Sequence, residues 1–308
     1  MINKVIKSLR SFGVYYTFIA IIASIFNKIN PNFRISHLFH HYKYKLVSKY
    51  INKKYSYIIG HASNDTPKTF INDSKYIWIC WWQGIDQAPD IVKVCIDSVK
   101  KRYSNKKIII IDQKNYSNYI DIPKIIIEKV NKGIFSITFF SDILRFCLLE
   151  KYGGVWIDST IFLNKKVNMD GYSFFSVKHN LYSKWHVCRG KWSGFFIGAS
   201  KNNCGIKLIR DILLAYAQNE NALIAYLLVD AVIGIAYDNL SAFKKQVDAV
   251  PVNNSKIFVM QNELNDEFSS FLVPSDVNKL SYKFKYNLTV DHKETVYGEL
   301  LNNIKENQ

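Results

Sequence analysis

The feature that most constrains the fold of this chain is a strand–helix–strand succession between residues 76 and 112. The run YIWICWW (76–82) has the length and aromatic content of a buried strand, and KKIIIID (106–112) is a β-branched run of the same kind. Between them, APDIVKVCIDSVKKRY (88–103) places apolar residues at the spacing of an amphipathic helix, with Pro89 near its start. Strands that are joined through a helix over so short a stretch pair in parallel, with a right-handed crossover. The succession therefore predicts a parallel sheet.

Strands and helices continue to alternate after residue 112, which predicts an α/β protein. FFSDILRFCLLEKYGG (139–154) has a helical apolar stripe and ends at Gly153 and Gly154, and VWIDSTIFL (155–163) is a strand interrupted at Asp158. Later segments follow the same pattern. We expect strands within 174–179 and 193–200, helices within 204–218 and 220–238, a short helix near 261–270, a strand at 282–290 and a C-terminal helix.

Residues 1–65 form a basic segment, which we expect to be a helical appendage to a domain at residues 66–308. The net charge is +16, yet no Asp or Glu occurs between Met1 and Asn64, where ten Lys and Arg residues lie. The apolar run VYYTFIAIIASIF (14–26) has thirteen residues, fewer than the roughly 20 that span a bilayer. Such a helix with basic neighbours is typical of a segment that lies on an anionic cytoplasmic leaflet. The alternatives are an ordinary core helix and a signal peptide, for which the cleavage site is poor.

Two further classes are disfavoured by the residues present. No zinc-finger, RNA-recognition or helix-turn-helix pattern accompanies the basic charge, so we expect no nucleic-acid partner. The five cysteines lie 15 or more residues apart, without a CxxC pair or a Cys/His cluster, which indicates neither a zinc site nor a disulfide framework. The chain is therefore expected in a reducing compartment, the cytoplasm.

Two acids follow strongly apolar strands, where open α/β sheets bind their ligands. For Asp112 a turn or capping role is the simpler interpretation. Asp158 follows a strand that leaves a helix directly through two glycines, and a carboxylate there can hold Mg²⁺ or Mn²⁺ together with substrate phosphates. Asp142 and Arg145 lie three residues apart on one side of the preceding helix, and alone they indicate a surface ion pair.

The block SDILRFCLLEKYGGVWIDST (141–160) resembles the central block of sugar-transferring enzymes in the capsular polysaccharide synthesis protein family. That family is related to glycosyltransferases whose core reads S-D-x-x-R, then Y-G-G, an apolar pair and D-x-D. The resemblance extends over roughly Tyr76 to Tyr237. It implies a GT-A type, Rossmann-like nucleotide-sugar-binding fold, retention of anomeric configuration and a divalent metal, Mn²⁺ or Mg²⁺, at the donor diphosphate.

The resemblance also implies roles for individual residues. The metal contact would come from Asp158, with Thr160 at the position where related enzymes have a second acid, so a neutral hydroxyl should weaken metal binding. Asp158 and Asp230 would be catalytic. The donor pocket would be lined by Trp81, Trp82, Gln83, Gly84, Asp142, Arg145, Gly153, Gly154 and Ser159. Later candidates for phosphate or acceptor contacts are Trp192, Lys279, Lys283 and His292.

Together these observations predict a glycosyltransferase that moves a sugar from a nucleotide-sugar donor to a growing capsular or other cell-surface polysaccharide. The acceptor would be a saccharide or a lipid-linked saccharide, and the enzyme would be peripheral on the inner face of the cytoplasmic membrane. Two alternatives stay open. One is a metal-dependent phosphotransferase that acts on a polymer precursor, and the other is a non-catalytic assembly protein of a polysaccharide-synthesis complex.

Overall fold

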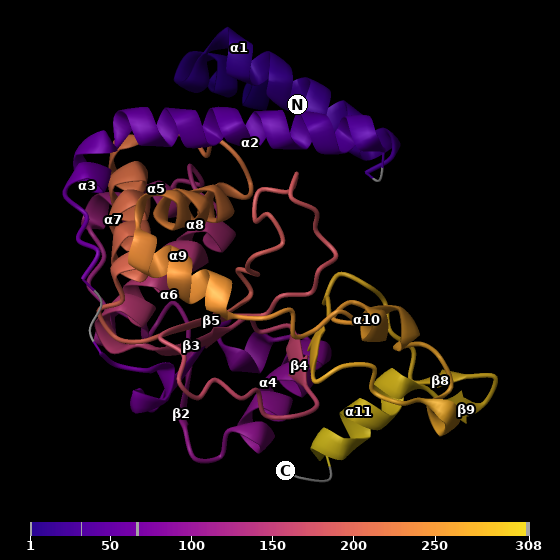
Figure 1. Ribbon diagram of the computed structural model, residues 1–308. Coiled ribbons are helices and arrows are strands. Elements are labelled where there is room, and N and C mark those ends of the chain that lie inside the picture. Colours follow the sequence, from indigo (N-terminus) through magenta and orange to yellow (C-terminus); the bar gives the residue numbers. More distant parts are fainter. Residues whose placement is uncertain (1, 32, 66–67, 306–308) are drawn as a thin grey trace.

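The computed structural model describes residues 2–31, 33–65 and 68–305, and its centre is a mixed sheet between helices (Figure 1). The strand order is β2-β1-β3-β6-β5; β1 pairs in parallel with β2 and β3, while β6 runs antiparallel to β3 and β5. The strands are β1 (Tyr76–Cys80), β2 (Lys107–Ile111), β3 (Gly154–Ile157), β5 (Phe174–Ser176) and β6 (Phe196–Ala199). The predicted α/β class and the parallel β1–β2 unit are confirmed.

The antiparallel edge of the sheet was not expected from the sequence. Segments 158–173 and 177–195 contain no helix, so β5 and β6 join the sheet without the crossover helix that a parallel pair requires.

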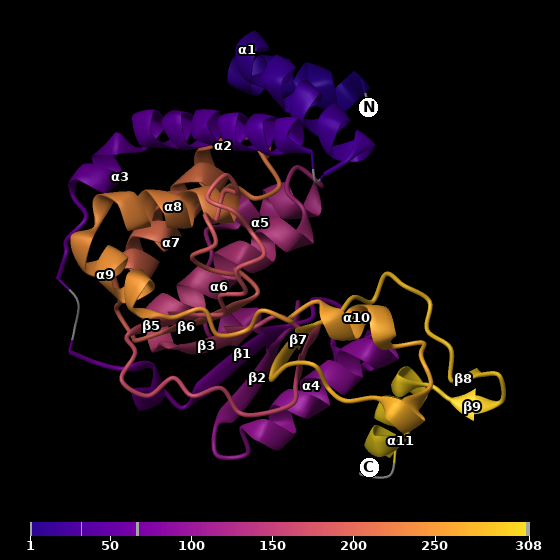
Figure 2. The same ribbon diagram turned by 45° about the vertical axis from the view of Figure 1, so that its right-hand side comes forward.

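Alternate side chains of the central strands enter two separate cores. Trp78 and Trp156 pack on one face with α6, α7 and α8, whereas Ile77 and Val155 pack on the other face with α4. Figures 1 and 2 show the group α6–α9 above the sheet and α4 below it. The helices are α4 (Asp90–Arg102), α5 (Lys124–Asn131), α6 (Ile137–Tyr152), α7 (Cys204–Asn219), α8 (Leu228–Asn239) and α9 (Ser241–Ala249).

A C-terminal lobe lies beside the sheet and is joined to it through a second strand pair. In this pair β4 (Ile161–Leu163), which directly follows the turn at Asp158, runs antiparallel to β7 (Val277–Lys279). The lobe also holds α10 (Val259–Glu263), β8 (Thr289–Val290), β9 (Lys293–Glu294) and α11 (Val296–Lys305), which packs against α4. The strand expected at 282–290 is reduced to β8, because Tyr282–Leu288 forms a loop in contact with the rest of the lobe.

The predicted N-terminal helices are present and lie across the top of the molecule in Figure 1. They are α1 (Ile2–Ile29), with a kink at Gly13, α2 (Arg34–Lys54) and the short α3 (Ser56–Gly60). The α2 helix packs on α8, and the Tyr44 hydroxyl accepts a hydrogen bond of 3.1 Å from the backbone N–H of Leu227. The predicted domain boundary after residue 65 meets Thr66 and Pro67, which lie outside the described residues.

The apolar N-terminal helix is longer than the thirteen-residue run indicated. Val5–Ile29 is long and apolar enough to cross a membrane by length and composition, and only 22% of its most apolar window is buried inside the protein. The sequence argument that this segment is too short to span a bilayer therefore does not hold, because the helix continues beyond the apolar run at both ends.

Candidate active site

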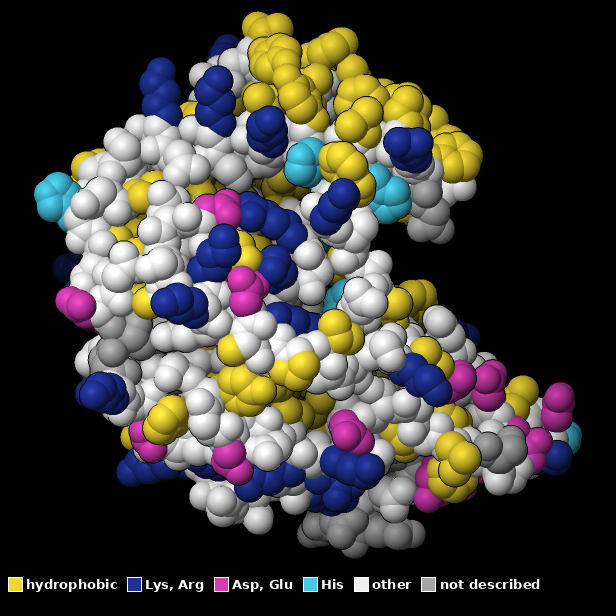
Figure 3. Space-filling view, in the orientation of Figure 1, with side chains coloured by type: hydrophobic (Ala, Val, Ile, Leu, Met, Phe, Trp, Pro, Cys, Tyr) yellow, Lys and Arg dark blue, Asp and Glu magenta, His cyan; other side chains and the backbone are white. Residues whose placement is uncertain are grey.

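A cleft of about 640 Å³ opens at the carboxyl ends of β1 and β3 and reaches the C-terminal lobe. Figure 3 shows the molecule hollowed on one side, between the N-terminal helices and this lobe. Polar and charged lining comes from Gln83, Thr138, Ser141, Asp142, Arg145, Asp158, Ser159, Thr160, Gln261, Lys279, Ser281 and Lys283. Its aromatic lining comes from Trp81, Trp82, Trp156, Tyr226, Phe258 and Tyr282.

The junction of α6 and β3 brings the predicted acids together. The helix begins after Ser136, whose hydroxyl accepts the backbone N–H of Phe139 at 3.2 Å. It ends at Gly153 and Gly154, whose φ values of +66° and +96° favour glycine. The chain therefore reverses at once into β3, so that Asp142 near the start of the helix and Asp158 after the strand approach one another.

Arg145 connects the two acids. Its Nη1 lies 3.0 Å from Asp142 Oδ1, and its Nη2 lies 3.2 Å from Asp158 Oδ1. The guanidinium also stacks over the Trp156 ring, at 5.0 Å from the ring centroid. Only 7% of the arginine side chain is exposed, so this is a buried bridge and not the surface ion pair that spacing alone indicated. Loss of one partner from such a group is costly, because the remaining charges stay buried.

The carboxylate of Asp158 is held by three donors. Trp156 Nε1 donates to Oδ1 at 2.9 Å, as expected for side chains two residues apart on one strand face. Lys279 Nζ lies 3.3 Å from Oδ2, and Arg145 is the third partner. Burial alone would raise the pKa of Asp158, but Lys279 and Arg145, helped by the Trp156 N–H, outweigh burial and lower that pKa below its usual value. Asp158 is therefore an anion in this structure.

Two other buried acids behave differently. Burial raises the pKa of Asp142 to about 7 despite its contact with Arg145, and nearby Asp158 and Asp230 contribute to the increase. Burial likewise raises the pKa of Asp230 to about 6, although Trp192 Nε1 donates to its Oδ1 at 3.0 Å. Perturbed carboxyls that gather beside a cleft are typical of functional sites.

A divalent cation fits the motif poorly. Lys279 Nζ lies 2.6 Å from Thr160 Oγ1 as well as near Asp158, so an ammonium already occupies the space between the two predicted metal ligands. Mg²⁺ and Mn²⁺ select oxygen ligands, and both Asp158 oxygens already accept donors. Among residues 2–31, 33–65 and 68–305, no group of three or more His, Cys, Asp or Glu side chains is placed to hold a metal ion.

Most of the predicted donor residues lie together, but not all of them. Trp81, Trp82, Gln83, Ser159 and Lys283 line the cleft with the acids. Gly84 and Asp112 instead line a separate recess of about 130 Å³. Asp112 Oδ1 accepts the backbone N–H groups of Lys114 and Asn115, which is the turn role considered first.

Gly153 and Gly154 are explained by packing and do not line the cleft. A Cβ at Gly153 would lie 2.7 Å from the backbone nitrogen of Lys201, and one at Gly154 would overlap the carbonyl oxygen of Tyr76.

Three further predicted residues lie away from the cleft lining. Trp192 is 1% exposed and donates a hydrogen bond to Asp230, so its ring is not placed to contact a phosphate or an acceptor in the cleft. His292 lies in the exposed turn between β8 and β9, so it is not placed to contact phosphate in the cleft. Asp230, in α8, does not line the cleft, although its charge interacts with Arg145 and Asp142.

Several cleft residues were missed from the sequence. Trp156 could have been found, because it precedes Asp158 by two residues and shares its strand face. Tyr226, Gln261 and Tyr282 come from loops and from α10, and no local pattern marks them.

Comparisons with known proteins place the chain in a family. The model of the capsular polysaccharide synthesis protein family matches residues 27–300. Six solved chains match, and one of them, titled "PaToxG Glycosyltransferase", has a TM-score of 0.42 and 17% identity over 69% of this chain and 83% of that chain. Structural similarity at this TM-score and sequence identity is too low to indicate an activity. No curated protein matches significantly. Because the family match extends over most of its length, the protein belongs to the capsular polysaccharide synthesis protein family.

Proposed function

We propose that this protein is a glycosyltransferase that moves a sugar from a nucleotide-sugar donor to a growing capsular or other cell-surface saccharide. The observation that carries the proposal is the cluster of Asp142, Arg145, Asp158 and Lys279 in one cleft at the carboxyl edge of the sheet. Ligands of open α/β sheets bind at this edge. The family match supports a role in polysaccharide synthesis.

The lining of the cleft suits each part of such a donor. Trp81, Trp82 and Tyr282 offer faces on which a base or a sugar can stack. Arg145, Lys279 and Lys283 supply positive charge for a diphosphate. Asp142 and Ser141 can hydrogen-bond to sugar or ribose hydroxyls.

The reaction breaks the bond between the anomeric carbon and the diphosphate oxygen, and the electron pair leaves with the oxygen. A bond then forms from the acceptor hydroxyl oxygen to the anomeric carbon, on the face that the diphosphate leaves if configuration is retained. The hydroxyl proton passes to the departing phosphate or to solvent. Negative charge grows on the diphosphate in the transition state, and cations fixed in the cleft stabilise it.

A membrane-bound acceptor would account for the N-terminal helices. Exposed apolar side chains of α1 (Val14, Phe18, Ile21, Ile25 and Ile29) follow one another at helical spacing, and Figure 3 shows hydrophobic side chains gathered over this end of the molecule. Lys and Arg residues around them suit an anionic leaflet. The location that we propose is the inner face of the cytoplasmic membrane.

A second cavity of about 490 Å³ lies under α1 and α2, and Tyr226 lines both this cavity and the cleft. His37, His40 and Lys43 also line it and can contact the phosphate of a lipid-linked saccharide. The residue that this cavity shares with the cleft, Tyr226, supports an acceptor of this class.

A screen of nucleotide sugars tests the proposal. The full-length protein is incubated with UDP-, GDP-, ADP- and CDP-sugars and with lipid-linked saccharide extracts, and the release of nucleoside diphosphate is measured. We expect release from one donor class, with a sugar-extended acceptor detected by mass spectrometry and its anomeric configuration read by NMR. Transfer of a phosphate-containing group would favour the phosphotransferase. No release and no nucleotide binding with any donor would favour the non-catalytic assembly protein.

A further inference from the structure

Lys279 is carried to the acidic motif by backbone pairing across a long sequence separation. Residue 279 pairs with Ile161 in the β4–β7 ladder, and the N–H of Leu280 donates to the Thr160 carbonyl at 2.8 Å. On its other side the N–H of Lys279 donates to the Ile257 carbonyl at 2.8 Å. The lysine backbone is thus held between two segments.

The ammonium of Lys279 faces both the motif and the cleft. It lies 2.6 Å from Thr160 Oγ1, 3.3 Å from Asp158 Oδ2 and 5.4 Å from the centroid of the Phe195 ring. It also lines the cleft, and 23% of its side chain is exposed. An ammonium in this position can keep its contacts to the motif and still present an N–H to an anion in the cleft.

We propose that the Lys279 ammonium takes the place of the divalent cation, so that the diphosphate of the donor binds and leaves without a metal ion. This proposal rests on the function proposed above. The lysine also accounts for the departure of the motif from D-x-D. An acid at position 160 would pair directly with Lys279 and neutralise it, whereas a threonine hydroxyl binds the ammonium and leaves its charge available.

The charges already present around Asp158 favour the lysine over a metal ion. Asp158 is already shared between Arg145 and Lys279. A metal bound at about 2.1 Å to Asp158 Oδ2 and Thr160 Oγ1 would have to displace Lys279 or lie against its charge. The lysine instead gives a fixed positive charge beside the leaving oxygen, and this charge stabilises the electron pair that the oxygen takes when the anomeric bond breaks.

Nucleoside diphosphate binding to the full-length protein tests this inference. Isothermal titration with UDP, GDP, ADP and CDP is run once in EDTA and once in Mn²⁺. For the diphosphate that binds most tightly we expect Kd values that agree within about twofold, a difference below 1 kcal/mol. Binding that requires Mn²⁺ would overturn the inference and leave the proposed function intact. No binding of any diphosphate in either condition would contradict the proposed function itself.

Substitutions at Lys279 make the test specific. We expect Lys279→Ala to weaken binding in EDTA by about tenfold or more, because one charge-assisted contact is lost. Mn²⁺ should restore much of that affinity in Lys279→Ala, since the freed Asp158 and Thr160 oxygens can then bind the metal. Lys279→Arg keeps the charge and should bind in EDTA.

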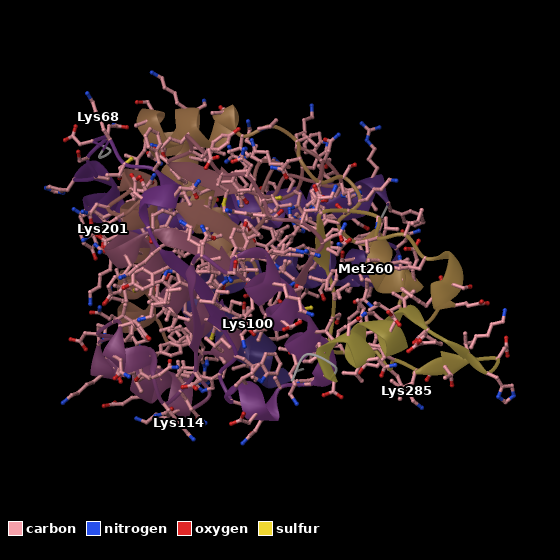
Figure 4. All side chains as sticks on the ribbon, turned by 90° about the horizontal axis from the view of Figure 1, so that it is seen from below. Lys68, Lys100, Lys114, Lys201, Met260 and Lys285 are labelled. Atoms are coloured by element: carbon pink, nitrogen blue, oxygen red, sulfur yellow. The ribbon has the colours of Figure 1, made fainter. Side chains whose placement is uncertain are left out.

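Two further variants serve as a control and as a substitute for Lys279→Ala. Lys285→Ala is the matched control, because Lys285 is exposed, does not line the cleft and is labelled at the edge of the C-terminal lobe in Figure 4. Its affinity should equal that of the unchanged protein. If Lys279→Ala does not fold, Lys279→Met keeps the apolar stem and should show the same loss in EDTA. Unchanged affinity in a folded Lys279→Ala or Lys279→Met variant would overturn the inference.

Discussion

At the scale of single residues the site depends on Arg145. One guanidinium contacts Asp142, Asp158 and the ring of Trp156, and the pKa values of the two acids move in opposite directions. Burial acts to raise the pKa of both acids. Asp158 also faces Arg145 and Lys279, which together outweigh burial, whereas Asp142 is paired with Arg145 and is affected by the charges of Asp158 and Asp230.

The raised pKa of Asp142 makes stability depend on pH. The folded protein keeps a proton on Asp142 up to a pKa of about 7, while the unfolded chain releases it at the ordinary aspartate value of 3.8. The stability from this proton is complete below about pH 4 and is lost as pH rises through 7. We expect the unfolding free energy to fall over this range, relative to Asp142→Asn, by at least about 1 kcal/mol, since one pKa unit corresponds to about 1.4 kcal/mol.

Urea unfolding of both proteins at several pH values between 4 and 8 measures this difference. Asp142→Asn is the reference because its amide cannot titrate while its shape is kept. A difference between the two proteins that stays constant over the whole range would mean that Asp142 is ionised throughout.

At the scale of elements the α6–β3 junction determines where the acids lie. Gly154 has φ of +96°, and a Cβ there would overlap the Tyr76 carbonyl oxygen. We expect Gly154→Ala to lower the unfolding free energy by more than about 2 kcal/mol, because both the backbone conformation and the packing oppose a side chain. Gly60→Ala is the control, since Gly60 has a φ that any residue adopts and no heavy atom within 4 Å of such a Cβ. Urea denaturation that gives equal losses for the two variants would show that the junction tolerates a side chain.

The way the elements pair also explains which parts of the fold and the site could be predicted from the sequence. The periodicity of apolar residues was sufficient to predict β1, α4, β2, α6 and β3. The resemblance to the family block was needed to bring together Asp142, Arg145 and Asp158. The contact of Lys279 with Thr160 could not be predicted, because it arises from pairing of strands that lie more than 100 residues apart. The burial of Trp192 could not be predicted for a related reason, because it depends on a contact with Asp230 of α8.

At the scale of the whole molecule, the N-terminal helices are attached to the part of the protein that contains the cleft. The helices are anchored on the body through the Tyr44 hydroxyl and through Glu220, which accepts from the Tyr50 hydroxyl at 2.7 Å. The apolar face of α1 points away from that body and is available to a membrane. The cavity under α1 and α2 shares Tyr226 with the cleft.

Binding to lipid vesicles tests this orientation. Phe18 is 59% exposed on α1, and Tyr57 is 57% exposed on α3, so the two form a matched pair. We expect Phe18→Asp to weaken binding to phosphatidylglycerol-containing vesicles about tenfold or more, because burying a Phe side chain is worth about 1.5–3 kcal/mol. Tyr57→Asp should have little effect, and salt should release the unchanged protein. Equal effects of the two substitutions would contradict this orientation, and release by detergent alone would mean that α1 spans the bilayer.

The proposed sugar-transferring site depends most directly on Asp158. The decisive measurement is the rate of nucleoside diphosphate release from the preferred nucleotide sugar by Asp158→Asn and by Asp112→Asn. Both acids follow a strand of the central sheet, but only Asp158 lines the cleft. We predict that Asp158→Asn lowers the rate by at least about 100-fold, the scale seen when one electrostatic contact of an active site is removed, while Asp112→Asn leaves it unchanged. A folded Asp158→Asn variant that releases nucleoside diphosphate at the original rate would contradict this role of Asp158.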